Sequence, residues 1–240
     1  MNWNNYLLEK KSPSGYYADL GVFEGTVSGI FDLSTIPTHT KILDMTTPLK
    51  RFKLTYTNLS SLNANKNIEA IRLTEINNER VSVFSTLPNL KYLHISVNNQ
   101  NEIPDLSPLK NLEVLILSSI KKVDNINFLR GLTNLKTLYI RGINNMYDLE
   151  PLSSLTNLEE LFLHCGKMSG TGQCVKSMEP ISKLTNLKYL VFLLNVEKRN
   201  YDITPLLSLK KLQKLDILHS YLNNDNREKL LNELPLITEL

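Results

Sequence analysis

The sequence has few cysteines and no apolar run long enough for a membrane helix. Its 240 residues include two cysteines, Cys165 and Cys174, which excludes a disulfide-rich scaffold. The two could bridge within one loop or remain free thiols, and free thiols suit a reducing cytosol. The longest uninterrupted apolar run is Tyr189–Leu194, far short of the roughly 18–20 residues that cross a bilayer. A membrane-spanning helix is therefore excluded, and no membrane partner is expected.

A strong excess of charge is also missing. The chain has 27 Lys and Arg against 24 Asp and Glu, a net charge of +3 and a pI of 8.7. Nucleic-acid-binding domains typically exceed a pI of about 9, so we expect no nucleic-acid partner. Residues 1–11 show no basic segment followed by the apolar stretch of a signal peptide. We therefore expect a cytoplasmic protein, although a secreted chain whose signal was removed would look the same.

Motifs for catalysis or cofactor binding are missing as well. The sequence contains no complete phosphate loop, dinucleotide fingerprint, zinc spacing or nucleophile elbow. Gly166–Gly172 is rich in glycine but lacks the Gly-Lys-Ser/Thr ending of a phosphate loop. His164 and Cys165 adjoin in an extended segment, so their side chains point apart, and no third group orients them. His94, His164 and His219 belong to repeats too distant to share a metal. We expect no enzyme, no cofactor and no metal site.

The sequence is instead rich in one phrase, x-Leu-x-x-Leu-x-Leu. Forty of its 45 leucines follow residue 48. Eight copies begin at residues 48, 67, 89, 111, 134, 157, 186 and 211, a truncated ninth begins at 235, and their spacings run from 19 to 29 residues. In the copy that starts at residue 111, Leu115 and Leu117 share one face of a short strand and Ile116 points the other way. Such internal repeats are the sequence signature of a solenoid.

The segment after each strand repeats too, as in Asp105-Leu-Ser-Pro-Leu109 and Asp202-Ile-Thr-Pro-Leu206. Proline suits the first position of a helix, and Ser107 and Thr204 are candidate N-caps. Each repeat is therefore predicted to contain a strand, a turn, a short helix or 3₁₀ turn and a return. One repeat buries leucines on one side only, so the repeats must stack on a continuous core with one parallel sheet. The predicted fold class is an α/β repeat solenoid.

Two segments lie outside this array. Residues 1–47 are poor in leucine and carry glycines among aromatic and β-branched residues, which predicts a β-rich N-terminal cap, with a separate binding module as the alternative. Residues 48–223 hold the repeats. Residues 224–240 are predicted to be a capping helix, with Leu230, Leu231 and Leu234 inward, and a last partial repeat. The 29-residue spacing between the copies at 157 and 186 predicts a protruding loop within Lys167–Lys176.

The phrase resembles the leucine-rich-repeat family. The pattern Asp-Ile/Leu-x-Pro-Leu followed by Leu-Thr-Asn-Leu resembles its internalin-like subclass of 22-residue repeats, and the resemblance covers residues 48–240. It implies a right-handed horseshoe with a concave parallel sheet, about eight repeats and terminal caps. The sequence departs from the family where an Asn usually caps the strand, since Ile76, Ile120 and Ile143 stand there. The resemblance also suggests one alternative function, a secreted or surface-attached adhesion module.

The residues between the inward leucines form the candidate binding site. Ile116, Tyr139, Phe162 and Val191 are expected to align on four consecutive repeats as an exposed apolar stripe with a polar rim, which is typical of an interaction surface. The alternative is that they serve only β-propensity. Tyr139 and Phe162 would be the anchors of a protein partner. The candidate protein-binding residues are Tyr92, His94, Ile116, Tyr139, Arg141, Phe162, His164, Tyr189 and Val191.

Charges on this face are expected to be polarised along the solenoid. Basic residues precede acidic ones in the order Lys50, Arg51, Lys53, Arg72, Lys91, then Glu159, Glu160 and Asp216. Such a field would attract an acidic partner, and a solvated face is the alternative. We therefore expect a monomeric, non-enzymatic scaffold that binds a protein partner, for example as an inhibitor or immunity-type protein.

Overall fold

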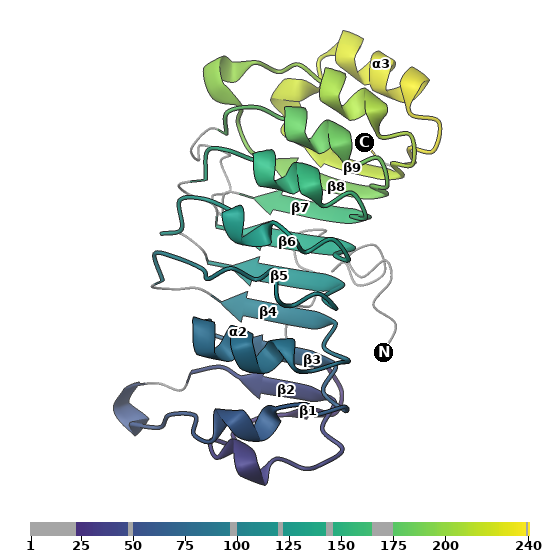
Figure 1. The fold of residues 1–240 in the computed structure, drawn as a ribbon. Coiled ribbons are helices and arrows are strands. Elements are labelled where there is room, and N and C mark those ends of the chain that lie inside the picture. Colours follow the sequence, from purple (N-terminus) through teal and green to yellow (C-terminus); the bar gives the residue numbers. More distant parts are fainter. Residues whose placement is uncertain are drawn as a thin grey trace.

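The computed structural model describes residues 23–47, 50–96, 100–119, 122–142, 146–164, 175–238 and 240. Within these ranges, one sheet holds nine parallel strands in the order in which they occur along the chain (Figure 1). The strands are β1 (Thr26–Val27), β2 (Ile42–Met45), β3 (Ala70–Leu73), β4 (Tyr92–Ser96), β5 (Val114–Ser118), β6 (Thr137–Arg141), β7 (Glu160–His164), β8 (Tyr189–Leu193) and β9 (Lys214–Ile217). The predicted parallel solenoid is confirmed.

The strands pair in a register that repeats the sequence phrase position for position. Leu115 of β5 pairs with Leu138 of β6, and Leu138 pairs with Leu161 of β7. These side chains are fully buried and belong to one continuous cluster, here called the leucine core. Because side chains alternate between the two faces of a strand, the equivalent leucines of successive repeats pack beside one another in this core, as the spacing predicted.

The return segments are mostly single 3₁₀ turns. Proline lies in the first turn of η5, η6 and η8, where its missing N–H needs no partner. The 3₁₀ turns are η1 (Leu33–Thr35), η2 (Lys50–Phe52), η3 (Leu59–Leu62), η4 (Asn127–Leu129), η5 (Glu150–Ser154), η6 (Glu179–Lys183), η7 (Glu197–Arg199), η8 (Thr204–Ser208) and η9 (His219–Tyr221). Two α-helices are described, α2 (Asn78–Ser85) and α3 (Asn224–Glu233).

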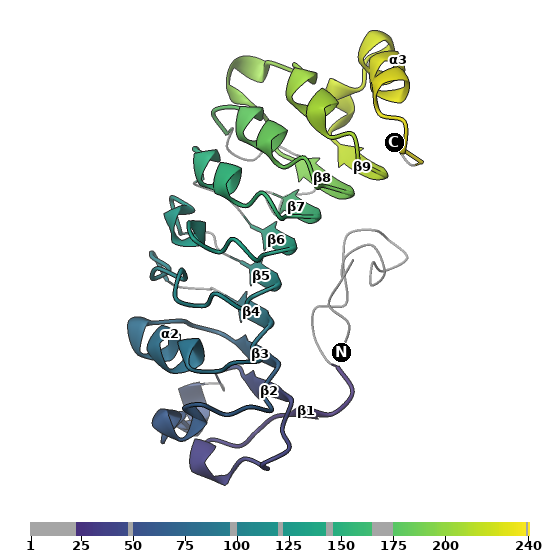
Figure 2. The same ribbon diagram turned by 45° about the vertical axis from the view of Figure 1, so that its right-hand side comes forward.

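The stack of repeats is curved, with the sheet on its inner side and the helical returns on its outer side (Figure 2). Strands repeat every 4.7–4.9 Å, whereas a helix with its side chains is about 10 Å wide. The outer side therefore needs more length per repeat than the sheet, which bends the stack. The sheet face turned away from the leucine core is here called the concave face.

A ladder of asparagines joins the repeats at the start of the phrase. Each of these side-chain amides donates a hydrogen bond of 2.7 to 3.0 Å to a backbone carbonyl of the preceding repeat. Lys211 replaces asparagine in the next copy, and its ammonium donates to Asn186 Oδ1 at 2.7 Å. The sequence departs from the family at the strand end, but an asparagine ladder exists at the strand start. Its donors are Asn67, Asn89, Asn111, Asn134, Asn157 and Asn186.

The predicted N-caps are wrong. No helix follows Ser107, and η8 has Ile203 as its N-cap residue, without a side-chain cap. Instead, Asp105 and Asp202 form turns, in which the backbone N–H groups of Ser107 and Thr204 donate to their carboxylates at 2.9 Å. The hydroxyls of Ser107 and Thr204 donate to the same carboxylates. An Asp side chain accepts from the backbone two residues on as readily as a serine caps a helix, so the sequence pattern permits both arrangements.

The first phrase copy does not form a strand. Residues Lys50–Phe52 form η2, and Phe52 and Leu54 are exposed. The preceding strand is β2, and together with β1 it extends the sheet into residues 23–47. The leucine phrase does not predict β2, because Thr40, 2% exposed, stands where the next repeat has Ile68. The domain bounds 1–47, 48–223 and 224–240 stay a prediction.

The C-terminal helix is confirmed as α3. Leu230 and Leu234 are buried, whereas Leu231 is 51% exposed, so the inward orientation predicted for Leu231 is wrong. Leu230 lies on the inward face of α3 and Leu234 follows the helix directly as its C-cap, while residue 231 lies about 100° away from 230 around the axis. In the parts of the chain that the structure describes, no helix has the length and apolar character needed to span a membrane.

Candidate functional site: the concave face

The register aligns the predicted site residues on neighbouring strands. Ile116 pairs with Tyr139, Tyr139 with Phe162, and Phe162 with Val191. The same line continues to both ends of the sheet and is here called the middle column. Its members from β2 to β9 are Asp44, Arg72, His94, Ile116, Tyr139, Phe162, Val191 and Asp216.

Two further columns flank it on the concave face. One contains Tyr92 and Tyr189 together with Val114, Thr137 and Glu160, which pair in succession from β4 to β8. The other places Arg141 beside His164 at the carboxyl ends of β6 and β7. The structure therefore brings the nine candidate residues onto one sheet face, as the alternation predicted.

The expected exposure of this stripe is wrong. Ile116, Tyr139 and Val191 are 0% exposed, and Phe162 is 2% exposed. They belong to a second apolar cluster, separate from the leucine core, which is here called the concave cluster. Alternation tells which face a side chain occupies, but not whether that face meets water. The cluster contains Ile42, Ala70, Tyr92, Val114, Ile116, Tyr139, Phe162, Tyr189, Val191 and Leu193.

Ile42, Ala70 and Phe23 belong to this face but were not predicted. Ile42 and Ala70 pair in register with each other, and Ala70 pairs with Tyr92. Ala70 lies in the phrase copy that begins at residue 67, and Ile42 lies on the strand before it. Continuing the column of Tyr92 towards the N-terminus could therefore have found both. Phe23 packs against the cluster from outside the sheet, and no repeat pattern points to it.

Aromatic rings stack along the concave face. The rings of Tyr139 and Phe162 lie 4.2 Å apart between centroids with an interplanar angle of 15°. Phe23 meets Tyr92 edge to face at 5.4 Å and 87°. Such pairs contribute about 0.5–1.5 kcal/mol beyond the area they bury. Because Tyr139 is buried and stacked on Phe162, we expect its truncation to destabilise the fold.

Polar groups on this face are few and hydrogen-bonded. Glu160 is 0% exposed, and its carboxylate accepts a hydrogen bond from the Thr137 hydroxyl of the neighbouring strand. His94 Nε2 lies 3.1 Å from Ser118 Oγ. The buried carboxyl group of Glu160 thus has a hydrogen-bond partner on the neighbouring strand, as buried polar groups usually do.

Two titrating groups on the face have shifted pKa values. Burial lowers the pKa of His164, and the nearby positive charge of Arg141 lowers it further. Burial raises the pKa of Asp216 at the β9 end of the middle column. Both shifts favour the neutral form, as expected where charge is removed from water.

The predicted polarisation of charge is not supported. Lys50, Arg51 and Lys53 lie in or beside η2, outside the sheet. Arg72 pairs with Asp44 at 3.4 Å within the middle column. At the amino-terminal edge of the strands, charged residues alternate in sign and pair: Lys91 with Glu113 at 2.6 Å, Lys136 with Glu113 at 3.6 Å and Lys188 with Glu159 at 2.5 Å.

The three histidines considered as metal ligands do not lie together. His94 lies on β4, His164 on β7 and His219 in η9, and no cluster of metal-ligating side chains occurs among the described residues. The Gly166–Gly172 segment and both cysteines lie outside the described residues. At the end of the predicted loop, Val175 is buried and its N–H donates to the Asn195 carbonyl at 2.8 Å, so this part belongs to the repeat.

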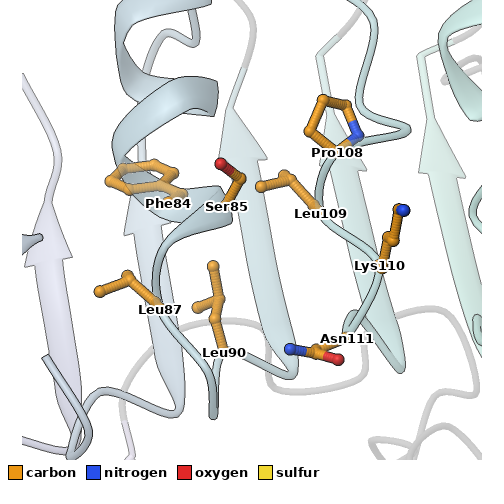
Figure 3. Close-up of a pocket in the computed structure, with 8 residues that line it drawn as sticks. All are labelled: Phe84, Ser85, Leu87, Leu90, Pro108, Leu109, Lys110 and Asn111. Atoms are coloured by element: carbon orange, nitrogen blue, oxygen red, sulfur yellow. The ribbon is translucent and has the colours of Figure 1, made fainter. Parts of the chain in front are cut away.

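A cleft of about 200 Å³ opens on the outer side of the solenoid (Figure 3). It lies where the α-helix α2 meets a neighbouring return that forms only turns, so the two returns differ in width. Ligand pockets typically measure about 300–1,000 Å³, and four of its lining residues belong to the leucine core. The cleft is a packing mismatch. It is lined by Phe84, Ser85, Leu87, Leu90, Pro108, Leu109, Lys110 and Asn111.

The sequence itself has no match among known families. No protein-family model matches the chain. No curated protein matches it with significance. The 22-residue subclass therefore stays a prediction.

Solved structures do share its fold. A leucine-rich-repeat protein of Leptospira interrogans superposes with a TM-score of 0.59 at 16% identity, over 83% of this chain and 54% of that one. The functional domain of InlJ from Listeria monocytogenes gives 0.50 at 18% identity, over 88% and 43%. This chain thus spans about half the length of these two proteins. Its register, its repeats and these structures together show that the chain is a leucine-rich-repeat solenoid.

Proposed function

We propose that the chain is a non-enzymatic scaffold that binds a protein partner through its concave face. The observation that carries this proposal is the apolar and aromatic character of that face from β4 to β8. A strand with one face in water alternates apolar and polar residues, and the leucine core already supplies the apolar face that a solenoid needs. Apolar and aromatic residues on the second face of the sheet therefore favour a protein partner.

The chemistry of the face suits protein recognition. Tyrosine is enriched in interface hot spots, and charged side chains are depleted from interface centres. Arg141 and His164 supply a polar rim beside Tyr139 and Phe162. The five strands from β4 to β8, each of five residues, measure roughly 19 by 17 Å, or about 320 Å², so an interface with the about 800 Å² that one partner buries in a standard complex would extend beyond these strands.

An inhibitor or immunity-type role, a monomeric state and a cytoplasmic location belong to the same proposal. A single array with a single recognition face suits a protein that acts by occupying its partner. Light scattering tests the monomer, and fractionation of the source cells tests the location. Recovery of the protein outside the cell would favour the adhesion-module alternative.

Affinity capture with charge-reversed variants tests the binding face. Arg141→Glu reverses a charge on the concave face, and Arg130→Glu makes the same change beside Glu150 on the returns. We expect wild type and Arg130→Glu to retain one protein partner that Arg141→Glu loses, with all three melting cooperatively. Equal capture by Arg141→Glu would reject the concave face near β6 as the site.

A further inference from the structure

One row of side chains at the amino-terminal edge of the sheet alternates strictly in charge. Each member directly precedes a strand, from β2 to β8, where the arrows of Figure 1 begin. Charged residues make up 21% of the chain, so an unbroken run of charged residues at equivalent places does not follow from composition. The members, here called the charge row, are Lys41, Glu69, Lys91, Glu113, Lys136, Glu159 and Lys188.

Backbone hydrogen bonds and ion pairs join the members of the charge row in strand order. The N–H of each member donates to the carbonyl of the member on the preceding strand at 2.7 to 2.9 Å. The carboxylate of Glu113 lies between the ammonium groups of Lys91 at 2.6 Å and Lys136 at 3.6 Å. The pairs at the two ends of the row measure 3.4 and 2.5 Å. Neighbouring strands therefore begin with charges of opposite sign.

The other contacts between repeats do not distinguish one neighbour from another. Leu115, Leu138 and Leu161 occupy equivalent places in the leucine core, and the asparagine ladder makes the same kind of bond at each of its steps. A strand that skipped one repeat would meet equivalent leucines and equivalent carbonyls. Chain connectivity opposes such a skip only weakly, because the entropy of loop closure grows slowly with loop length. Misassembly is accordingly a characteristic failure of repeat proteins.

The charge row does distinguish the correct neighbour from the next one. In the native order Glu69 is bonded to Lys91, and Lys91 to Glu113. If the strand of Lys91 were skipped, Glu69 would lie beside Glu113. Because the signs alternate without exception, every strand that skips one repeat meets its own sign. Like charges directly opposite on neighbouring strands are destabilising, whereas opposite charges are stabilising.

We propose that the charge row specifies the order in which the repeats pair, because it penalises any strand that skips a repeat. This role concerns assembly of the solenoid and does not depend on the function proposed above. Exposed ion pairs add little to the stability of a folded protein. The effect of the row is therefore expected in the choice between competing pairings, which is the purpose of specificity devices in repeated or symmetric folds.

Exchanging one pair within the row breaks the alternation at constant composition. Lys91→Glu/Glu113→Lys keeps the net charge and keeps opposite charges at these two positions, but it brings like charges together beside Glu69 and beside Lys136. Refolding by dilution from urea into about 10 mM salt, where the Debye length is about 30 Å, should yield several-fold less native monomer than wild type on size-exclusion chromatography. In about 1 M salt, where the Debye length is about 3 Å, the yields should converge. A wild-type yield in low salt overturns the proposal.

Two controls separate the pairing order from charge exchange and from stability. Arg130→Glu/Glu150→Arg exchanges an ion pair on the returns and should refold as wild type does. Asn157→Ala removes a hydrogen bond of the asparagine ladder and leaves the charge row intact, so it should refold in full yield in low salt. Urea denaturation gives the stability of each variant. If Asn157→Ala and the exchange variant lose stability and yield in the same proportion, the row only stabilises the fold, which overturns the proposal.

Inverting the whole charge row tests the alternation itself. Changing each Lys of the row to Glu and each Glu to Lys replaces every member, yet neighbouring strands again begin with opposite charges and a skipped strand again meets its own sign. We expect a low-salt refolding yield close to that of wild type and several-fold above that of the exchange variant. A yield as low as that of the exchange variant would mean that particular residues matter and their alternation does not, which overturns the proposal.

Discussion

At the scale of single residues, the aromatic residues of the concave face are expected to contribute to stability, because they are buried in an apolar cluster. Tyr139 is 0% exposed and stacks on Phe162. We expect Tyr139→Ala to lower the free energy of unfolding by about 3–5 kcal/mol, the usual cost of removing a buried aromatic ring. Tyr147→Ala removes a 45% exposed ring and should cost less than about 1 kcal/mol. Urea denaturation measures both, and a neutral Tyr139→Ala would mean that the ring is not enclosed.

His164 makes stability depend on pH. Its folded pKa lies below the ordinary value of 6.5, chiefly because of burial. Between these two pKa values the unfolded chain binds more protons, so the free energy of unfolding falls as the pH drops through 6.5 and levels off below the folded pKa. His164→Gln should flatten the curve between pH 7.5 and 5, whereas the exposed His39→Gln should follow wild type. Parallel curves for all three proteins would contradict the assignment.

At the scale of elements, the asparagine ladder joins each strand start to the preceding repeat. Asn157→Ala removes the bond to the Thr133 carbonyl and should lower the free energy of unfolding by about 1 kcal/mol. Asn232→Ala, in α3, removes the same side chain outside the ladder and should change it by less than about 0.5 kcal/mol. Thermal melts monitored by circular dichroism measure the difference, and equal effects would leave the ladder without a stabilising role.

The core of a single element cannot be altered without affecting the whole array. Leu138 of β6 is fully buried between Leu115 and Leu161. Leu138→Asp places a carboxylate with no partner in the continuous core, which costs several kcal/mol, so we expect loss of the cooperative melt. Leu231→Asp makes the same change at a 51% exposed position of α3 and should melt nearly as wild type. A folded Leu138→Asp would mean that the repeats do not share one core.

At the scale of the whole molecule, much of the fold could be predicted from one spacing. The Leu-x-Leu pair determines which side chains point inward, and the constant phrase aligns Ile116, Tyr139, Phe162 and Val191 across strands. The first strands could not be found this way, because Thr40 replaces the leading aliphatic residue of the phrase. Burial of the concave face could not be found either, since alternation describes a strand and its neighbours but not what lies above the sheet.

The strict strand order has a consequence for the speed of folding. Partners on adjacent strands are only 22 to 29 residues apart from β2 to β9, so the relative contact order is about 0.1, within the range of helical bundles and below the about 0.16–0.22 of sandwiches and barrels. Each loop that closes is short, and each closed repeat offers an edge to the next. We expect stopped-flow refolding in milliseconds rather than seconds, by growth outward from a nucleus of two or three neighbouring repeats, so that a parallel sheet here forms without the delay that long-range pairing usually brings.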